Sequence, residues 1–341
     1  MKLLFVINTP SQVYFWGPIV RELQGGGWRV DVLARRYQGT VLLLRHMGIH
    51  HHTFPSLPTR QLKPLELGVH LAVAVRQSVP RRPYRIVGFG IDATIAARLL
   101  CVRSLVYVDG EHLGIQWPLL DGSGDVIVTP EAFRRSFARA RHVRIQSYKE
   151  LAYLHPDRFT PDASIYEDIG IGYGTPYAIL RFSDLSSAHD RHQFGLSLAD
   201  KRNLIAGLSR HVRVFISSEA GLPADLQSFT LSIPYHRIHH ALAFAQLVVT
   251  DTGTMTTEAA VLGVPTVYCG SLANRSGVFQ ELAHRYQLLH VTQDPAEACA
   301  VSARLAAGRD GRQVRLQRLA RLLDDKVDVC DALVRLLTGE A

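Results

Sequence analysis

The stretch VTDTGTMTTEAAVLGVPTVY, residues 249–268, decides the fold class. An apolar run ends at residues 251–254, a helical segment carrying Glu258 follows, and residues 263–265 lead into a second apolar run. Apolar runs joined through a helix are typical of parallel strands buried in an α/β sheet. Gly253 lets the backbone approach a ligand closely. A helix that starts near Thr254 points amide groups and the positive end of its dipole at the turn.

This turn is a candidate phosphate site, because helix N-termini bind anions. Glu258 lies one turn further along the same helical face, where its carboxylate can accept hydrogen bonds from two sugar hydroxyls. Phosphate at the helix tip and a diol one turn along together match a nucleoside diphosphate. The alternative is a structural turn, in which a Thr or Asp caps the helix and Glu258 is solvated.

The same alternation of strands and helices runs along the whole chain. The expected strands of the first half lie at 2–7, 28–34, 85–90, 104–108, 125–129 and 142–146, and those of the second half at 177–182, 212–217, 246–250, 265–270 and 288–292. This pattern predicts two doubly wound, Rossmann-like parallel-sheet domains. The Gly- and Pro-rich stretch 155–176 is interpreted as the connection between them.

The expected domains are therefore 1–165 and 176–310, with a C-terminal amphipathic helix over 311–341. In open α/β sheets the ligand binds beyond the carboxyl ends of the strands, so a cleft between the domains is the expected site. The C-terminal helix is Arg-rich on one side. Packing against the domains is the first interpretation, and peripheral contact with an anionic membrane is the alternative.

Composition narrows the classes of function. Hydrophobic residues make up 47% of the 341-residue chain, which is typical of globular proteins, and the net charge of +8 favours acidic partners. The basic residues are dispersed rather than interleaved with aromatic ones, which disfavours nucleic acid. The four cysteines form no Cys-x-x-Cys pair, and the apolar run near the N-terminus is too short for a signal peptide. We therefore expect a cytoplasmic protein with free thiols.

Titratable residues follow one strand of the first domain. Asp109, Glu111 and His112 come directly after the strand at 104–108. Crowding such groups at a strand end suits general acid–base chemistry. Helix capping is one alternative, and a metal-binding pair formed by Asp109 and Glu111 is another. The loop at 8–18 offers Asn8 and Gln12 as hydrogen-bonding groups and lacks the G-x-G-x-x-G pattern of a dinucleotide site.

The second domain supplies candidate ligands for the phosphates. Arg181 ends its first strand, and arginine binds phosphate oxygens in a bidentate manner. His189 in the following loop is a weaker candidate. His236 and His240 are four residues apart, but no third ligand is evident, so no metal site is predicted.

The stretch 249–268 resembles the signature of GT-B-fold nucleotide-sugar enzymes, in particular the non-hydrolysing UDP-N-acetylglucosamine 2-epimerases. Those enzymes carry an Asp-Ser-Gly-Gly turn, a Glu-Ala pair and Leu-Gly-x-Pro, and this chain has the corresponding segments 251–254, 258–259 and 262–265. The resemblance implies that Gly253, Thr254 and Met255 bind the diphosphate and that Glu258 binds the ribose. It also places Tyr235 beside the nucleobase. The second glycine of the turn is Thr254 here, so a side chain stands at the phosphate approach.

Over nearly the whole chain the sequence is similar to an uncharacterised archaeal and bacterial family, the domain-of-unknown-function family numbered 354. The matching segments include VYVDGEH, SYKELAYLHPDRF and GTMTTEAAVLGVPTV. That family often has Pro-Pro-His where this chain has Pro10-Ser11-Gln12, which removes a histidine base from this loop.

Together the resemblances imply a metal-independent GT-B glycosyltransferase that uses a UDP-sugar and no cofactor. Asn8 and Gln12 would lie on the acceptor side, and Asp109, Glu111 or His112 would act as the base. A 2-epimerase on the same fold and a non-catalytic binding protein are the alternatives. The sugar, the acceptor and the oligomeric state are left open by the sequence.

Overall fold

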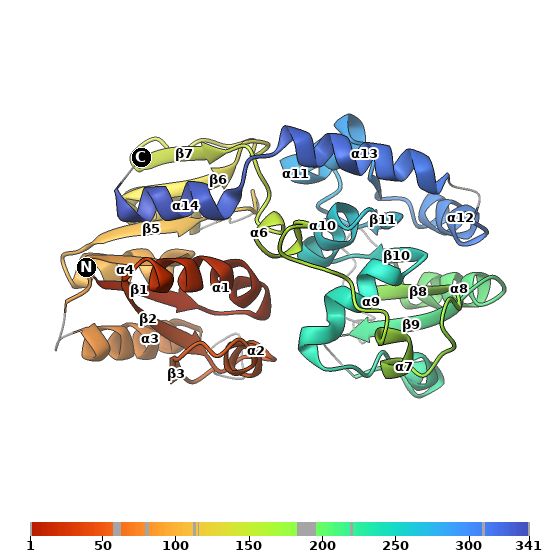
Figure 1. Ribbon diagram of the computed structural model, residues 1–341, viewed down its shortest axis with the longest axis horizontal. Helices are drawn as coiled ribbons and strands as arrows, with labels where there is room; N and C mark the ends of the chain where they lie inside the picture. Colours follow the sequence, from red (N-terminus) through yellow and green to blue (C-terminus); the bar gives the residue numbers. More distant parts are fainter. Residues whose placement is uncertain are drawn as a thin grey trace. The chain divides into compact units, whose positions relative to one another are not determined.

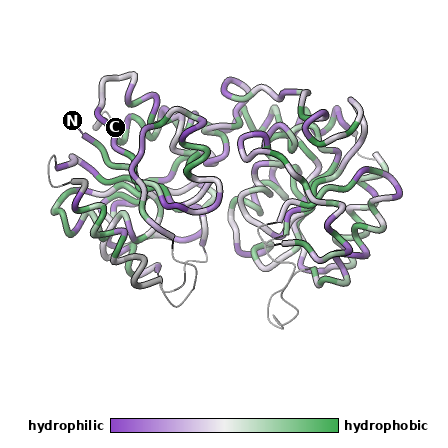
Figure 2. Tube along the Cα trace, turned by 90° about the horizontal axis from the view of Figure 1, so that it is seen from below, coloured by the Kyte–Doolittle hydropathy of each residue, from purple (hydrophilic) through white to green (hydrophobic). Residues whose placement is uncertain are grey.

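The computed structural model describes residues 2–56, 63–78, 82–111, 114, 116–182, 196–218, 221–308 and 311–339. The chain forms two compact units (Figure 1). Unit 1 contains Met1–Tyr153 and Val327–Ala341, and unit 2 contains Leu154–Lys326. In the tube of Figure 2 the most hydrophobic segments run through the inside of each unit.

Unit 1 is built on a seven-stranded parallel sheet of order β3-β2-β1-β4-β5-β6-β7. Its strands are β1 (Lys2–Ile7), β2 (Arg29–Arg35), β3 (His52–Phe54), β4 (Arg85–Phe89), β5 (Arg103–Tyr107), β6 (Val126–Pro130) and β7 (Arg141–Ile145). The strand order reverses between β1 and β4. Ligands of open α/β sheets bind at such a reversal.

Helices cover the sheet of unit 1 in two groups. α1 (Pro10–Gly25) packs against α2 (Thr40–His46) and α14 (Val329–Thr338), while α4 (Ile91–Leu99) packs against α3 (Lys63–Ser78) and α5 (Gln116–Ser123). A short helix, α6 (Leu151–Leu154), lies where the chain leaves the unit. The strands β1, β4 and β5 are buried along most of their length because both faces of the sheet are covered.

Unit 2 has a five-stranded parallel sheet of order β12-β11-β10-β8-β9. Its strands are β8 (Tyr177–Phe182), β9 (Arg213–Ser218), β10 (Leu247–Thr250), β11 (Thr266–Cys269) and β12 (Leu289–Thr292). One core layer packs α8 (Leu198–Leu208) and α12 (Pro295–Ala306) on the sheet, and the other packs α9 (Ile238–Phe244) and α10 (Gly253–Val261). The expected two doubly wound parallel-sheet domains are therefore confirmed.

The remaining helical segments of unit 2 are short except for the last one. They are α7 (Ile165–Asp168), η2 (Ala224–Phe229), η3 (Tyr235–Arg237), α11 (Gly277–Gln280), the π-helical turn η4 (Glu281–Arg285) and α13 (Arg312–Asp325).

The chain divides differently from the expected ranges 1–165 and 176–310. The stretch 155–176 belongs to unit 2 and includes α7. Arg237 holds it there through ion pairs with Asp162 at 2.7 Å and Asp168 at 2.6 Å. These partners lie about 70 positions before Arg237, and local composition does not reveal such a contact.

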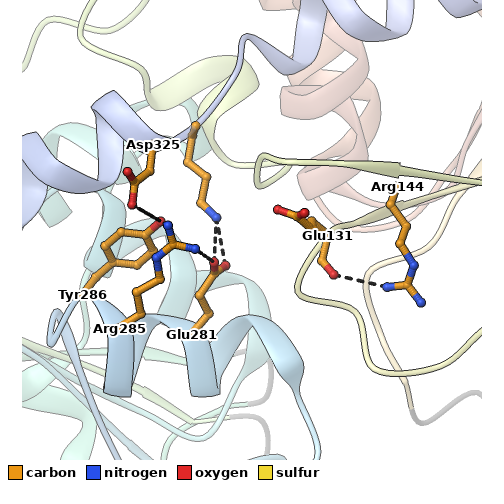
Figure 3. Close-up of polar contacts among 7 residues, drawn as sticks. Glu131, Arg144, Glu281, Arg285, Tyr286 and Asp325 are labelled. Atoms are coloured by element: carbon orange, nitrogen blue, oxygen red, sulfur yellow. Dashed lines mark hydrogen bonds and ion pairs between the residues drawn. The ribbon is translucent and has the colours of Figure 1, made fainter.

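The expected single helix over 311–341 is two helices, α13 in unit 2 and α14 in unit 1. The side chain of Lys326, at the break, is buried, and its ammonium lies 2.9 Å from a carboxylate oxygen of Glu281. The Asp328 side chain then accepts the backbone N–H of Cys330 at 2.8 Å and caps α14. Figure 3 shows Glu281 with Arg285, Tyr286 and Asp325, the groups that surround this exit from unit 2.

A loop rather than a helix connects β6 to β7. Arg144 on β7 holds this loop, because its guanidinium donates to the carbonyl oxygen of Glu131 at 3.2 Å (Figure 3). It also donates to the carbonyl oxygens of Arg135, at 2.8 Å, and Phe133. The edge strand is thus tied to the loop that precedes it.

Candidate functional site

The turn singled out in the sequence lies at the carboxyl end of β10, the middle strand of the unit 2 sheet. α10 begins at Gly253, with Thr252 as its N-cap residue. The expected helix start near Thr254 is therefore correct to one residue. By geometry, the first N–H groups of α10 have no acceptor within the helix.

The Thr252 side chain does not cap α10. Its hydroxyl lies 3.0 Å from the Thr250 hydroxyl, which in turn accepts the Thr252 N–H at 2.9 Å. In contrast, Ser197, Ser276 and Asp294 cap α8, α11 and α12 with their side chains. The capping role considered for Thr252 is thus not observed, and its threonine hydroxyl shapes the turn instead.

Gly253 is open on the side where a side chain would stand. A Cβ built at this position would meet only Leu272 Cδ1, at 3.8 Å, which is an ordinary contact. Met255, in contrast, is buried in the core layer under α9 and α10. The resemblance implies that Met255 binds the diphosphate, and only the backbone amide of Met255 is suited to do so.

Glu258 is 5% exposed, so it is not the solvated residue of the structural alternative. One of its carboxylate oxygens lies 2.9 Å from Nε2 of His239 on α9. Burying a carboxylate is costly unless a partner compensates it, and the imidazole is one such partner.

Charged residues from β8 and α8 lie beside the turn. The Asp251 N–H donates to the Arg181 carbonyl at 3.2 Å, so the ends of β10 and β8 are adjacent. The Arg181 guanidinium donates to the Ser217 hydroxyl at 3.1 Å. The buried Lys201 ammonium lies 3.8 Å from the Asp251 carboxylate. The structure thus brings Arg181 to the edge that also holds Gly253.

Tyr235 and His189 are the two other candidate binding residues of unit 2. Tyr235 lies in η3 and is about half exposed. His189 lies outside the described residues, so its role stays a prediction.

In unit 1 the carboxyl ends of β1 and β4 form one polar cluster. The Asn8 side chain donates to Asp92 at 2.6 Å, and its backbone N–H donates to the Gln12 side chain at 2.7 Å. Burial raises the pKa of Asp92, although the hydrogen bond from Asn8 opposes the shift. Asn8 and Gln12 thus share an edge with a buried acid that the sequence reading did not select.

A second cluster lies at the end of β5. Lys149 forms an ion pair with Asp109 and another with Glu150 at 3.1 Å. Burial disfavours the charge on Lys149, but the two carboxylates outweigh it and raise the lysine pKa above its ordinary value. Asp109 remains about one-third exposed. It is a carboxylate held by a buried lysine.

The predicted acid–base group is only partly assembled. Glu111 accepts the Arg134 N–H at 3.3 Å through a side-chain oxygen, and its carbonyl accepts the Arg135 guanidinium at 3.1 Å. Glu111 is therefore tied to the loop after β6, whereas Asp109 is tied to Lys149. His112 lies outside the described residues.

The histidines near 236–240 do not share one helical face. His236 is in η3, and His240 on α9 accepts the Asp162 N–H at 3.0 Å. Within the described ranges, no group of three His, Cys, Asp or Glu side chains is arranged to hold a metal ion. In the same part of the chain, no helix is long and apolar enough to cross a bilayer.

The sequence reading missed Asp92, Lys149 and His239. Asp92 begins the segment DATIAARLL, residues 92–100, whose pattern is that of an ordinary amphipathic helix, and its only signal was its position just after the expected strand at 85–90. Lys149 and His239 acquire their partners through tertiary contacts over 40 and 19 positions.

Comparison with solved structures identifies the type of fold. No protein-family model and no curated protein matches the sequence. The UDP-GlcNAc 2-epimerase of Neisseria meningitidis bound to UDP-GlcNAc is 11% identical, with 100% of both chains covered and a TM-score of 0.66. The UDP-GlcNAc 2-epimerase of Methanocaldococcus jannaschii is 12% identical, with 99% of this chain and 100% of that chain covered and a TM-score of 0.64.

A third neighbour is the glycosyltransferase VinC in complex with dTDP. It is 14% identical, with 99% of each chain covered and a TM-score of 0.60. With two Rossmann-like parallel sheets and neighbours of this kind, the chain has the expected GT-B-like fold. At these identities the likeness concerns the fold alone.

Proposed function

We propose that this protein is an enzyme that acts on a nucleotide-activated sugar, with a glycosyltransferase using a UDP-sugar as the first assignment. The supporting observation is the start of α10. This helix begins at the carboxyl end of the middle strand, is not capped by its N-cap side chain, and carries a buried carboxylate one turn further in.

Each feature of α10 suits one part of a nucleoside diphosphate. The amides of Gly253, Thr254 and Met255 would bind the diphosphate, and Arg181 would supply a positive charge beside them. Glu258 would accept hydrogen bonds from the ribose. In a transferase, the negative charge that develops on the leaving diphosphate is stabilised by the same amides.

The base for the acceptor hydroxyl is assigned to Asp109 of unit 1. It is partly exposed and paired with a buried lysine, so it is a carboxylate within reach of solvent. Glu111, His112 and the acceptor-side pair Asn8 and Gln12 keep the roles that the resemblance gives them. The reaction needs no cofactor, and we place the enzyme in the cytoplasm. Membership of the family numbered 354 rests on the sequence segments quoted above.

Nucleotide binding is the first test of the assignment. Melting temperatures should be measured with UDP, GDP, dTDP and UDP-N-acetylglucosamine, each against inorganic phosphate. We expect a rise with UDP and its sugar, of the size that ligand binding to the native state produces. If none of the nucleotides shifts the melting temperature, the assignment is wrong.

The second candidate is a 2-epimerase, and a specific feature of unit 1 favours it. Such a reaction needs several acid–base groups, and the sheet carries Asp92, Asp109 and Glu150 at its carboxyl edge. Incubation with UDP-N-acetylglucosamine alone distinguishes the two reactions. A manno-configured product without any acceptor would establish the epimerase, whereas a transferase does not change the configuration at C2 of the sugar.

A further inference from the structure

The contact between His239 and Glu258 joins two helices inside unit 2. The two side chains are 5% and 7% exposed, and Nε2 lies 2.9 Å from Oε1. A hydrogen bond in such a desolvated place is stronger than one at the surface, and each group would be costly to bury alone. The pair therefore fixes the carboxylate as well as compensating it.

The imidazole itself is held in place from a second side. The Phe159 ring meets the His239 ring edge-on, at 83° and 6.2 Å between centroids. The next residue on α9, His240, packs on Phe159 at 5.0 Å and accepts the Asp162 N–H. α9 is thus anchored by the segment that leads into α7, and His239 approaches Glu258 from a fixed direction.

A fixed carboxylate discriminates between sugars. With Oε1 held by His239, the plane of the carboxylate is set, and the directions in which it accepts hydrogen bonds are set with it. The carboxylate can then accept hydrogen bonds from both hydroxyls of a cis-diol at once. A sugar with a single hydroxyl leaves one of these acceptor directions without a donor. A site built to bind a hydroxyl rejects an analogue that lacks it, because buried polar groups are left without partners.

The fold alone does not determine whether the site selects ribose or 2′-deoxyribose. One structural neighbour was solved with UDP-GlcNAc, whose ribose carries a diol, and another with dTDP, whose sugar lacks the 2′-hydroxyl. We infer that His239 is a positioning residue that orients Glu258 and makes the nucleotide site selective for ribonucleotides over 2′-deoxyribonucleotides. This inference rests on the proposed nucleotide site.

The test compares two variants of His239 whose side-chain amides differ in length. In His239→Gln the amide nitrogen replaces Nε2, and in His239→Asn it replaces Nδ1 and does not reach Glu258. His240→Asn is the matched control on the same helix, because the asparagine oxygen replaces Nδ1 and can still accept the Asp162 N–H. Calorimetry on the full chain would give dissociation constants for UDP, 2′-deoxy-UDP and inorganic pyrophosphate.

We expect the wild type to prefer UDP over 2′-deoxy-UDP by about tenfold, the ratio that one hydrogen bond to a charged group supplies. H239Q and H240N should keep this preference, and H239N should reduce it below about threefold, a loss of more than half of that free-energy difference. Pyrophosphate affinity should be the same in all four proteins, which shows that the phosphate site remains folded.

Two results would overturn the inference alone. They are a wild type that binds UDP without preference, and an H239N variant that keeps the wild-type ratio. A wild type that binds neither UDP nor pyrophosphate would instead refute the proposed function, and the inference with it.

Discussion

At the scale of single residues, Gly253 is informative because the protein itself does not require it. Its φ angle is not in the left-handed region, and a Cβ would meet only Leu272, at 3.8 Å. No packing contact or backbone conformation explains the glycine. In the proposed account the reason is the ligand, whose diphosphate approaches the backbone at this position.

Gly253→Ala separates these explanations. Alanine favours the helix by up to about 1 kcal/mol, so the melting temperature should stay the same or rise. UDP affinity should fall by about tenfold, because the methyl group stands where the diphosphate approaches. Gly207→Ala in α8, where a Cβ also has open space, is the control and should leave UDP affinity unchanged. Wild-type affinity in Gly253→Ala would mean that no phosphate lies at this turn.

Asp92 gives a prediction about pH. Its pKa in the folded protein is raised above the ordinary 3.8 by burial. Its ionisation therefore destabilises the fold, an effect that is absent below the unfolded pKa and complete above the folded one. Asp92→Asn should raise the melting temperature at pH 8, and this gain should shrink as the pH falls towards 4.

Asp121 is the matched control, because its pKa is shifted in the opposite direction. Burial opposes its charge, but the backbone N–H groups of Arg139 and Ala140 outweigh that effect and lower its pKa. Asp121→Asn should therefore lower the melting temperature at pH 8, with a loss that fades as the pH falls through the acid range. If both variants showed the same trend with pH, the burial of Asp92 would not be the cause.

At the scale of elements, the sequence predicted what local patterning determines. The segment LADKRNLIAGL, residues 198–208, has the pattern of a helix, and α8 has the same bounds. β10 and α10 begin within one residue of their expected starts. β10 is a continuous apolar run, α8 has a capping box, and α10 follows directly on the polar turn at 251–252. The break between α13 and α14 was missed, because it depends on Lys326 reaching Glu281 across 45 positions.

The loop between β6 and β7 provides a test at this scale. Arg144 donates to backbone carbonyls of the loop and so replaces the contacts that a crossover helix would make. Arg144→Met removes these hydrogen bonds and should destabilise unit 1 by about 0.5–1.5 kcal/mol, the net contribution of an ordinary hydrogen bond. Chemical denaturation would measure this change, with Arg141→Met, an exposed arginine on the same strand, as the control. Equal stability of the two variants would show that the loop does not depend on Arg144.

At the scale of the whole molecule, the two-sheet architecture was predictable and the site was predictable in part. Alternating apolar strands and helices specify parallel sheets, and a polar turn after a strand marks their functional edge. The resemblance selected Glu258 but did not reveal its partner, His239. The pairing of Asp109 with Lys149 was missed for the same reason: burial and partners of charged groups follow from tertiary contacts.

The central claim is that the start of α10 and Glu258 bind a nucleoside diphosphate. Calorimetric titration of UDP into the wild type and Glu258→Gln tests it most directly, since glutamine keeps the shape of the buried side chain. We expect one-site binding to the wild type with a Kd below about 1 mM, and an affinity about tenfold lower in the variant. Absence of binding to the wild type, or equal affinity in the two proteins, would contradict it.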